Sequence, residues 1–253
     1  MLFDAGAASA TATMESPSRA TYNQCFISYL VCQPVKAILP VTVEARQFVS
    51  ADFIGGDPAL DFVNTVLGRD QAPRDWLDSY LSMLKWAGLA HLLPEKLLRS
   101  LAKKAQEEPA DAAAALKRAK LLREALFALI TALVSDTKPP KDALALLREH
   151  WLAGVRAHEL CVVDGRVVEK PREGAADFDL IASMVAYRMV NRVLRCPIDR
   201  LRICRGTNCA WLFIDSSKAG RRCWCDMAVC GNTAKSKRFQ ARARLRRKRP
   251  IAS

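Results

Sequence analysis

Hydrophobic residues recur at helical spacing through the middle of the chain. The stretch "DWLDSYLSMLKWAGL", residues 75–89, carries Trp76, Tyr80 and Leu84 at intervals of four residues, which predicts a helix. Residues 112–134 give the strongest pattern, because apolar side chains recur there on a single helix face. The same spacing predicts three more helices, at residues 95–104, 141–158 and 177–194.

A different pattern marks residues 160–170, "LCVVDGRVVEK". Two β-branched runs flank Asp164-Gly165, a dipeptide that favours the tight turn of a β-hairpin. The chain is therefore predicted to be mainly α, in the α+β class, with a helical body and a small β-hairpin over residues 51–196. We expect a poorly specified N-terminal extension at 1–50, and a cysteine-rich part with a basic helix at 200–253.

The net charge of +13 is concentrated in the last fifth of the chain. Of the 39 basic and 26 acidic residues, 15 basic and two acidic ones lie in residues 200–253, so 24 of each sign balance in residues 1–199. A concentrated positive segment favours polyanionic partners such as DNA or RNA. No secretory signal is apparent, and the apolar stretch 25–43 is too interrupted to span a membrane. We therefore expect a cytoplasmic, nucleoid-associated protein without a membrane partner.

Five of the nine cysteines lie in residues 204–230. Cys204 and Cys209 form one C-x4-C pair, Cys225 and Cys230 form another, and 15 residues separate the pairs. Two such pairs can place four thiolates around one tetrahedral Zn²⁺, and reduced thiols favour a metal over disulfides. We predict Zn²⁺ at these four cysteines, with ordinary buried cysteines or disulfides as the alternative. By spacing alone, Cys223 could replace Cys225.

Three local expectations accompany this metal site. Gly206 is expected to adopt backbone angles that a Cβ would forbid. The apolar residues 211–215, "WLFID", are expected to pair as a strand with the segment before Trp224. Trp211, Phe213 and Trp224 would form a small core, too small to fold without a metal.

Residues 204–235 resemble the CGNR zinc-finger family. The resemblance implies that Cys225, rather than Cys223, is the metal ligand. Thr233 stands where the family has an arginine, so a phosphate contact made by that arginine would be missing here. Thr233 or Asn232 is instead expected to cap the helix that follows. The resemblance rests on Cys204, Cys209, Phe213, Asp215, Ser217, Arg221, Arg222, Trp224, Cys225, Met227, Cys230, Gly231, Asn232 and Lys235.

The body resembles a second family, the ABATE domain. The motif "ALDFVNTV", followed by a helix that contains Trp86, is similar to the start of that domain, over about residues 53–194. Such proteins are regarded as stress-induced transcriptional regulators. The resemblance therefore implies DNA binding in a stress response, with a body that senses a signal or forms a homodimer.

A basic helix is predicted from about residue 234. Residues 231–249 hold nine basic residues and no acid, and several of the basic ones recur on one helix face. Phe239 lies beside this row and is expected to pack back onto the finger. The residues expected to contact nucleic-acid phosphates are Arg221, Arg222, Lys235, Lys237, Arg238, Arg242 and Arg246.

The body offers weaker candidates for chemistry. Asp57, Asp61, Asn64 and Thr65 could line a small-molecule pocket, but we favour a local role, in which Asp57 and Asn64 satisfy turns and caps. The sequence has no Gly-rich phosphate loop, nucleophile elbow or HExxH motif, so we expect no enzyme. The leading hypothesis is a zinc-dependent, DNA-binding transcriptional regulator. The alternatives are an RNA-binding or ribosome-associated protein, and a ligand-binding body with a structural zinc finger.

Overall fold

The computed structural model describes residues 41–69, 71–172, 174 and 176–247, the last six by their backbone alone. Most of the expected N-terminal extension, with Cys25 and Cys32, lies outside the described residues. Its described part holds a short strand, β1 (Thr42–Val43), and one helical turn, η1 (Ser50–Asp52). In the ranges given above, no helix is long and apolar enough to cross a lipid bilayer.

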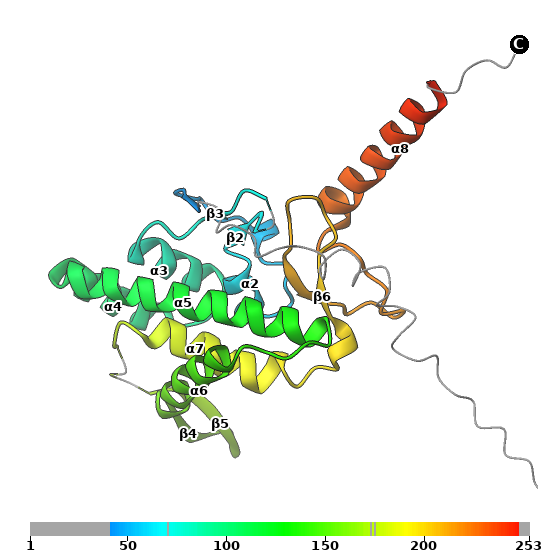
Figure 1. Ribbon diagram of the computed structural model, residues 1–253. Helices are drawn as coiled ribbons and strands as arrows, with labels where there is room; N and C mark the ends of the chain where they lie inside the picture. Colours follow the sequence, from blue (N-terminus) through cyan, green and yellow to red (C-terminus); the bar gives the residue numbers. More distant parts are fainter. Residues whose placement is uncertain (1–40, 70, 173, 175, 248–253) are drawn as a thin grey trace, which may run out of the picture. The chain divides into compact units, whose positions relative to one another are not determined.

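The body is mainly helical, as predicted, and α5 is its central helix. Helix α5 contacts α2, α3, α4, α6 and α7 (Figure 1). Its buried face carries Leu122, Leu126, Leu129 and Ile130, which places the predicted apolar stripe in the core. The body helices are α2 (Pro58–Val63), α3 (Tyr80–Leu89), α4 (Glu95–Glu107), α5 (Pro109–Val134), α6 (Lys141–Arg156) and α7 (Leu180–Arg188), the last continued by a π-helical turn, η2 (Met189–Val193).

Several helix ends differ from the sequence prediction, and two of them have a clear local cause. Trp76 precedes α3, because the Ser79 hydroxyl accepts a hydrogen bond from the Ser82 amide and caps the helix there. Helix α6 ends at Arg156 because His158 already begins a strand. Local capping and pairing therefore set these ends, rather than the apolar spacing.

The predicted hairpin is present. Strands β4 (His158–Val163) and β5 (Arg166–Pro171) pair in antiparallel fashion. Asp164 and Gly165 have φ angles of 50° and 71°, as a two-residue type I′ turn requires. Several apolar side chains near the hairpin tip are exposed, including Leu160, Val162 and Val167.

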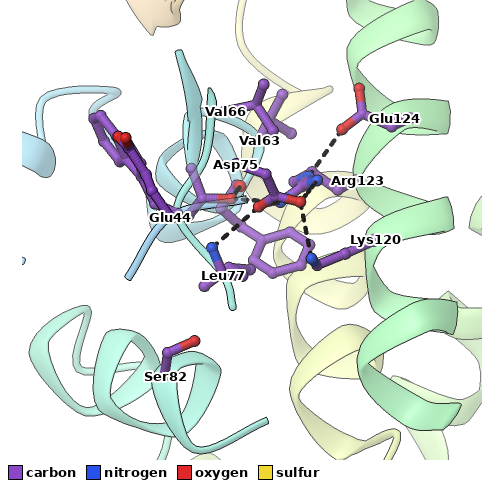
Figure 2. Close-up of polar contacts among 12 residues, drawn as sticks. Glu44, Val63, Val66, Asp75, Leu77, Ser82, Lys120, Arg123 and Glu124 are labelled. Carbon is purple, nitrogen blue, oxygen red and sulfur yellow. Dashed lines mark hydrogen bonds and ion pairs between the residues drawn. The ribbon is translucent and has the colours of Figure 1, made fainter. Parts of the chain in front are cut away.

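A buried ion-pair network fixes the loop after α2 to α5. Strands β2 (Val66–Leu67) and β3 (Arg74–Asp75) form a small sheet with β1. The two Nη atoms of Arg123 lie 2.8 and 2.9 Å from the carboxylate oxygens of Asp75, and Lys120 Nζ lies 2.9 Å from Asp75 Oδ2 (Figure 2). Arg123 also donates to the Thr65 hydroxyl, 3.1 Å away. Burial alone would raise the pKa of Asp75, but the hydrogen bonds from Arg123 outweigh it and hold this pKa at about 2.

We expect Arg123→Met to lower the free energy of unfolding by about 3 kcal/mol. The substitution leaves the buried Asp75 carboxylate with Lys120 as its remaining cationic partner. Urea denaturation at neutral pH measures this loss. The lowered pKa of Asp75 means that its stabilising effect is present above about pH 4 and is lost as the pH falls through about 2. The difference between variant and wild type should therefore shrink in acid.

Arg99→Met is the matched control for this prediction. Arg99 pairs with Glu95 on the exposed face of α4, where an ion pair contributes at most about 1 kcal/mol. Equal losses in the two variants would show that the Asp75 network does not hold the loop.

Candidate metal centre

The first cysteine pair lies on a tight turn between two strands. Strands β6 (Leu201–Ile203) and β7 (Leu212–Ile214) pair in antiparallel fashion, and Cys204 directly follows β6. The Cys204 amide donates to the Trp211 carbonyl, 2.8 Å away, which closes the turn. The predicted pairing of β7 with the segment before Trp224 is therefore wrong. That segment touches the turn instead, where the Arg205 amide donates to the Cys223 carbonyl.

The second pair lies at the start of a long helix. A π-helical turn, η4 (Met227–Gly231), carries Cys230 and continues without a break into α8 (Asn232–Arg247). The Asp226 carboxylate accepts a hydrogen bond from the Val229 amide at 2.7 Å and caps this helix. The cap expected from Thr233 or Asn232 is therefore wrong, because the Thr233 hydroxyl donates to the Val229 carbonyl. The sequence signal for the true cap is an aspartate, Asp226, directly before the first helical residue, Met227, because an N-cap aspartate accepts from the amide three residues later.

The four predicted cysteines converge. Their Sγ atoms all lie within 4.8 Å of one another. Cys225 Sγ is 3.6 Å from Cys209 Sγ and 3.8 Å from Cys230 Sγ. A tetrahedral Zn²⁺ with Zn–S bonds of about 2.3 Å separates its sulfur ligands by about 3.8 Å. The arrangement therefore fits one Zn²⁺ ion.

Backbone and side-chain groups around the cluster favour thiolate sulfur at Cys204. The amides of Gly206 and Cys225 both donate to Cys204 Sγ, at 3.3 Å. Hydrogen bonding to the Cys209 thiol lowers the pKa of Cys204, and the same contact raises the pKa of Cys209. The close sulfurs therefore do not ionise equally, and a divalent metal displaces the protons that remain on them.

Cys223 is not one of the converging thiols. It is half-buried, and its Sγ lies 3.6 Å from the Arg221 carbonyl oxygen. The ambiguity that the spacing left between Cys223 and Cys225 is therefore resolved by the fold, in which Cys225 faces the other three sulfurs.

Gly206 is needed for space rather than for its backbone angles. Its φ is not positive, contrary to the expectation, whereas Asn208 and Ala210 have φ angles of 58° and 56°. A Cβ at position 206 would lie 2.8 Å from Cys230 Sγ and 3.3 Å from Cys204 Sγ. The backbone at Gly206 therefore packs directly against the sulfur cluster.

The finger is joined to the body through β7. The Asn64 side chain donates to the Leu212 carbonyl and accepts from the Leu212 amide, both at 2.8 Å, and so imitates a neighbouring strand. Trp211 Nε1 donates to the Val66 carbonyl, and its ring packs edge-on against Trp76 with centroids 5.5 Å apart. The Trp211 and Phe213 side chains thus belong to the core of the body.

The local role expected for Asp57 and Asn64 holds only in part. Asp57 caps α2 by accepting from the Ala59 amide. Asn64 acts at long range instead, because its partner Leu212 is distant in the sequence. Asp61 Oδ1 accepts from the Gly55 amide at 2.7 Å, and the Gly55 carbonyl in turn accepts from the Ile214 amide of β7. Burial raises the pKa of Asp61 to about 7, although the Gly55 hydrogen bond opposes this.

Asp215 organises the loop after β7, a role that its sequence position does not reveal. It is buried, and its carboxylate accepts from the Ser217 and Arg222 amides at 3.0 and 2.7 Å. Burial would raise its pKa, but hydrogen bonds from the Ser217 side chain and from the Arg222 and Ser217 amides keep the pKa below its usual value. The loop that carries Arg222 is thus fixed to β7.

The residues expected to contact phosphate fall into three groups. Arg221, Lys235, Lys237 and Arg238 are exposed. Arg222 is partly used inside the finger, because its guanidinium donates to the Cys225 carbonyl and lies 4.8 Å from the centre of the Phe213 ring. The side chains of the remaining two lie outside the described residues, although the backbone at both positions is helical. These two are Arg242 and Arg246.

We expect Gly206→Ala to abolish stoichiometric zinc, because the added methyl group would occupy space held by two sulfurs. Elemental analysis of the purified protein measures the zinc content. Gly88→Ala is the control, since a Cβ there meets only the flexible end of Leu98. Full zinc occupancy in Gly206→Ala would contradict the packing described for the cluster.

We expect Asn64→Leu to lower the free energy of unfolding by at least about 2 kcal/mol, because it leaves both backbone groups of Leu212 buried without a partner. Chemical denaturation of the zinc-loaded protein measures the change. Asn191→Leu removes an amide that makes a weak exposed hydrogen bond with Arg195 and a second one with the Tyr187 hydroxyl, and it should change stability by less than about 0.5 kcal/mol. A neutral result for Asn64→Leu would mean that β7 does not depend on the body.

The comparisons with known proteins agree with this arrangement. The ABATE family model, described as "Putative stress-induced transcription regulator", matches residues 56–196, and the CGNR zinc-finger model matches residues 200–243. No curated protein matches the chain. The first model covers more than half of the chain, and the second covers all four converging cysteines, so a Zn²⁺ site follows the body. The chain therefore belongs to the ABATE family and carries a CGNR zinc finger.

Proposed function

We propose that the protein is a zinc-dependent, DNA-binding transcriptional regulator. The observation that carries the proposal is the direct continuation of the metal centre into α8, a helix of sixteen residues without an acidic side chain. Cys230 lies in η4, which leads into α8, so a metal ion at the cluster would fix the start of the helix. The helix would then present its cations to a nucleic acid as one rigid surface.

In this proposal, Cys204, Cys209, Cys225 and Cys230 are the zinc ligands. Zn²⁺ would supply structural cross-linking and charge neutralisation for a segment that has little core of its own. The chain's residues do the remaining work. The amides of Gly206 and Cys225 orient Cys204 Sγ, and Asp226 caps the helix that leaves the site.

Electrostatics favours a phosphate backbone as the partner of α8. Lys235, Lys237 and Arg238 are exposed, and no acid on the helix neutralises them. Arg221 adds an exposed cation on the neighbouring loop. Lysine and arginine that neutralise phosphates gain affinity through the release of counterions. The first property that we expect is therefore an affinity for duplex DNA that depends strongly on salt and, as far as phosphate contacts are concerned, not on sequence.

The body would transmit a signal to the finger. The Asn64 side chain and the Gly55 carbonyl hold β7 by hydrogen bonds to its backbone, while Arg123 binds both Asp75 and Thr65 beside Asn64. A change in the position of α5 would therefore move the loop that supports β7. This contact path supports a regulatory role for the body, and the stress-related family description agrees with such a role.

We expect Lys235→Ala combined with Arg238→Ala to weaken binding to duplex DNA, because each substitution removes one phosphate contact from the same side of α8. The slope of log affinity against log salt concentration should decrease in magnitude by about two, one for each lost phosphate contact. Fluorescence anisotropy with a labelled duplex, repeated over a range of salt concentrations, measures both quantities.

The control for this prediction is Lys138→Ala combined with Lys141→Ala, which removes the same charge from an exposed part of the body. An equal loss in this control would indicate general attraction rather than a site on α8. Tighter binding to single-stranded or duplex RNA of matched length would favour the RNA-binding alternative over a DNA-binding regulator.

A further inference from the structure

Among its cations, helix α8 exposes a large apolar side chain, Phe239. Phe239 is 75% exposed, and every described side chain from Lys235 to Ala241 is exposed as well. The expectation that Phe239 packs back onto the finger is therefore wrong. Phenylalanine is also a poorer helix former than alanine or glutamine, so this position does not serve helix stability.

Phe239 lies within the cationic face of the helix. It follows Lys235 by one helical turn and stands next to Arg238, whose guanidinium lies 5.9 Å from the centre of the Trp224 ring. Positions 242 and 246 continue the row from position 238 at intervals of four residues. A surface that meets phosphates on this face would therefore also meet the Phe239 ring.

The dimensions of α8 select the groove. The major groove of B-DNA, about 12 Å wide, admits an α-helix, whereas the minor groove, about 6 Å wide, does not. Cations beside the ring can reach the phosphates that line the groove, so the ring itself would face the base edges. The apolar group displayed on those edges is the C5-methyl group of thymine.

We propose that α8 enters the major groove of DNA and that Phe239 packs against thymine C5-methyl groups. This inference rests on the proposed DNA binding of the finger and adds a base preference to it. The same contact distinguishes DNA from RNA, because uracil lacks the methyl group and the major groove of A-form RNA is too deep and narrow for side chains to read.

An anionic membrane is a poorer partner for this helix. A helix that lies in a bilayer surface needs a broad apolar face opposite its charged one. Position 245, the other large apolar residue of α8, follows Phe239 by six residues and so falls on a different side of the helix. The two large apolar residues therefore form no continuous apolar face, and Phe239 alone lies within the cationic row, which suits a groove rather than a lipid layer.

The test compares two duplex pools of identical random, A·T-rich sequence, one made with thymidine and one with deoxyuridine. Deoxyuridine keeps the phosphates and the base pairing but removes the C5-methyl group. The zinc-loaded full chain should bind the thymidine pool more tightly, by about fourfold for each contacted methyl group. Phe239→Ala should bind both pools equally, with an unchanged salt dependence.

Gln240→Ala is the matched control, because Gln240 is the next exposed residue on the helix. It should keep the preference for thymidine. Zinc content and helical circular dichroism of all three proteins establish that they are folded. Equal binding of both pools by the wild type, or a preference that survives in Phe239→Ala, would overturn the inference while leaving phosphate binding intact.

Failure of the wild-type protein to bind either duplex pool would overturn both the proposed DNA binding and the contact of Phe239 with thymine. Anionic vesicles of phosphatidylserine and phosphatidylcholine provide the last comparison. Binding to them that Phe239→Ala abolishes, with DNA binding unaffected, would assign Phe239 to a membrane surface instead.

Discussion

The crowding of four sulfur atoms within 4.8 Å is the constraint on which the finger depends. Thiols this close repel one another once they ionise, and a divalent cation turns that repulsion into four bonds. The cluster ties the turn after β6, the loop that carries Cys225 and the first turn before α8. The other contacts described at the start of α8 are single hydrogen bonds, such as the Asp226 cap, so a cation at the cluster would be its strongest support.

The finger also depends on the body. Asn64 supplies to Leu212 the hydrogen bonds that a neighbouring strand would supply, and Trp211 packs against Trp76 in the core. Arg123 of α5 fixes the same loop through Asp75 and Thr65. The body and the finger thus share one core. The central helix α5 contacts, through Arg123, the loop that positions β7. This continuity is the physical basis for expecting a regulator rather than two independent modules.

Sequence patterns predicted the features that depend on neighbouring residues. The buried face of α5 follows from apolar spacing, the hairpin turn from Asp164-Gly165, and the cysteine cluster from its paired spacing. The partner of β7 and the role of Asn64 could not be predicted in this way, because both depend on residues that meet only in the folded chain. Gly206 was singled out correctly but for the wrong reason, since its neighbours in space are sulfur atoms of distant cysteines.

Removal and return of zinc would show whether DNA binding depends on the metal centre. The full chain would be stripped with a chelator under reducing conditions, and its affinity for duplex DNA measured before stripping, after stripping and after the addition of Zn²⁺ or Mg²⁺. We expect the affinity for duplex DNA to be lost on stripping and to be restored by Zn²⁺ but not by Mg²⁺. Undiminished DNA binding by the reduced, metal-free chain would contradict it.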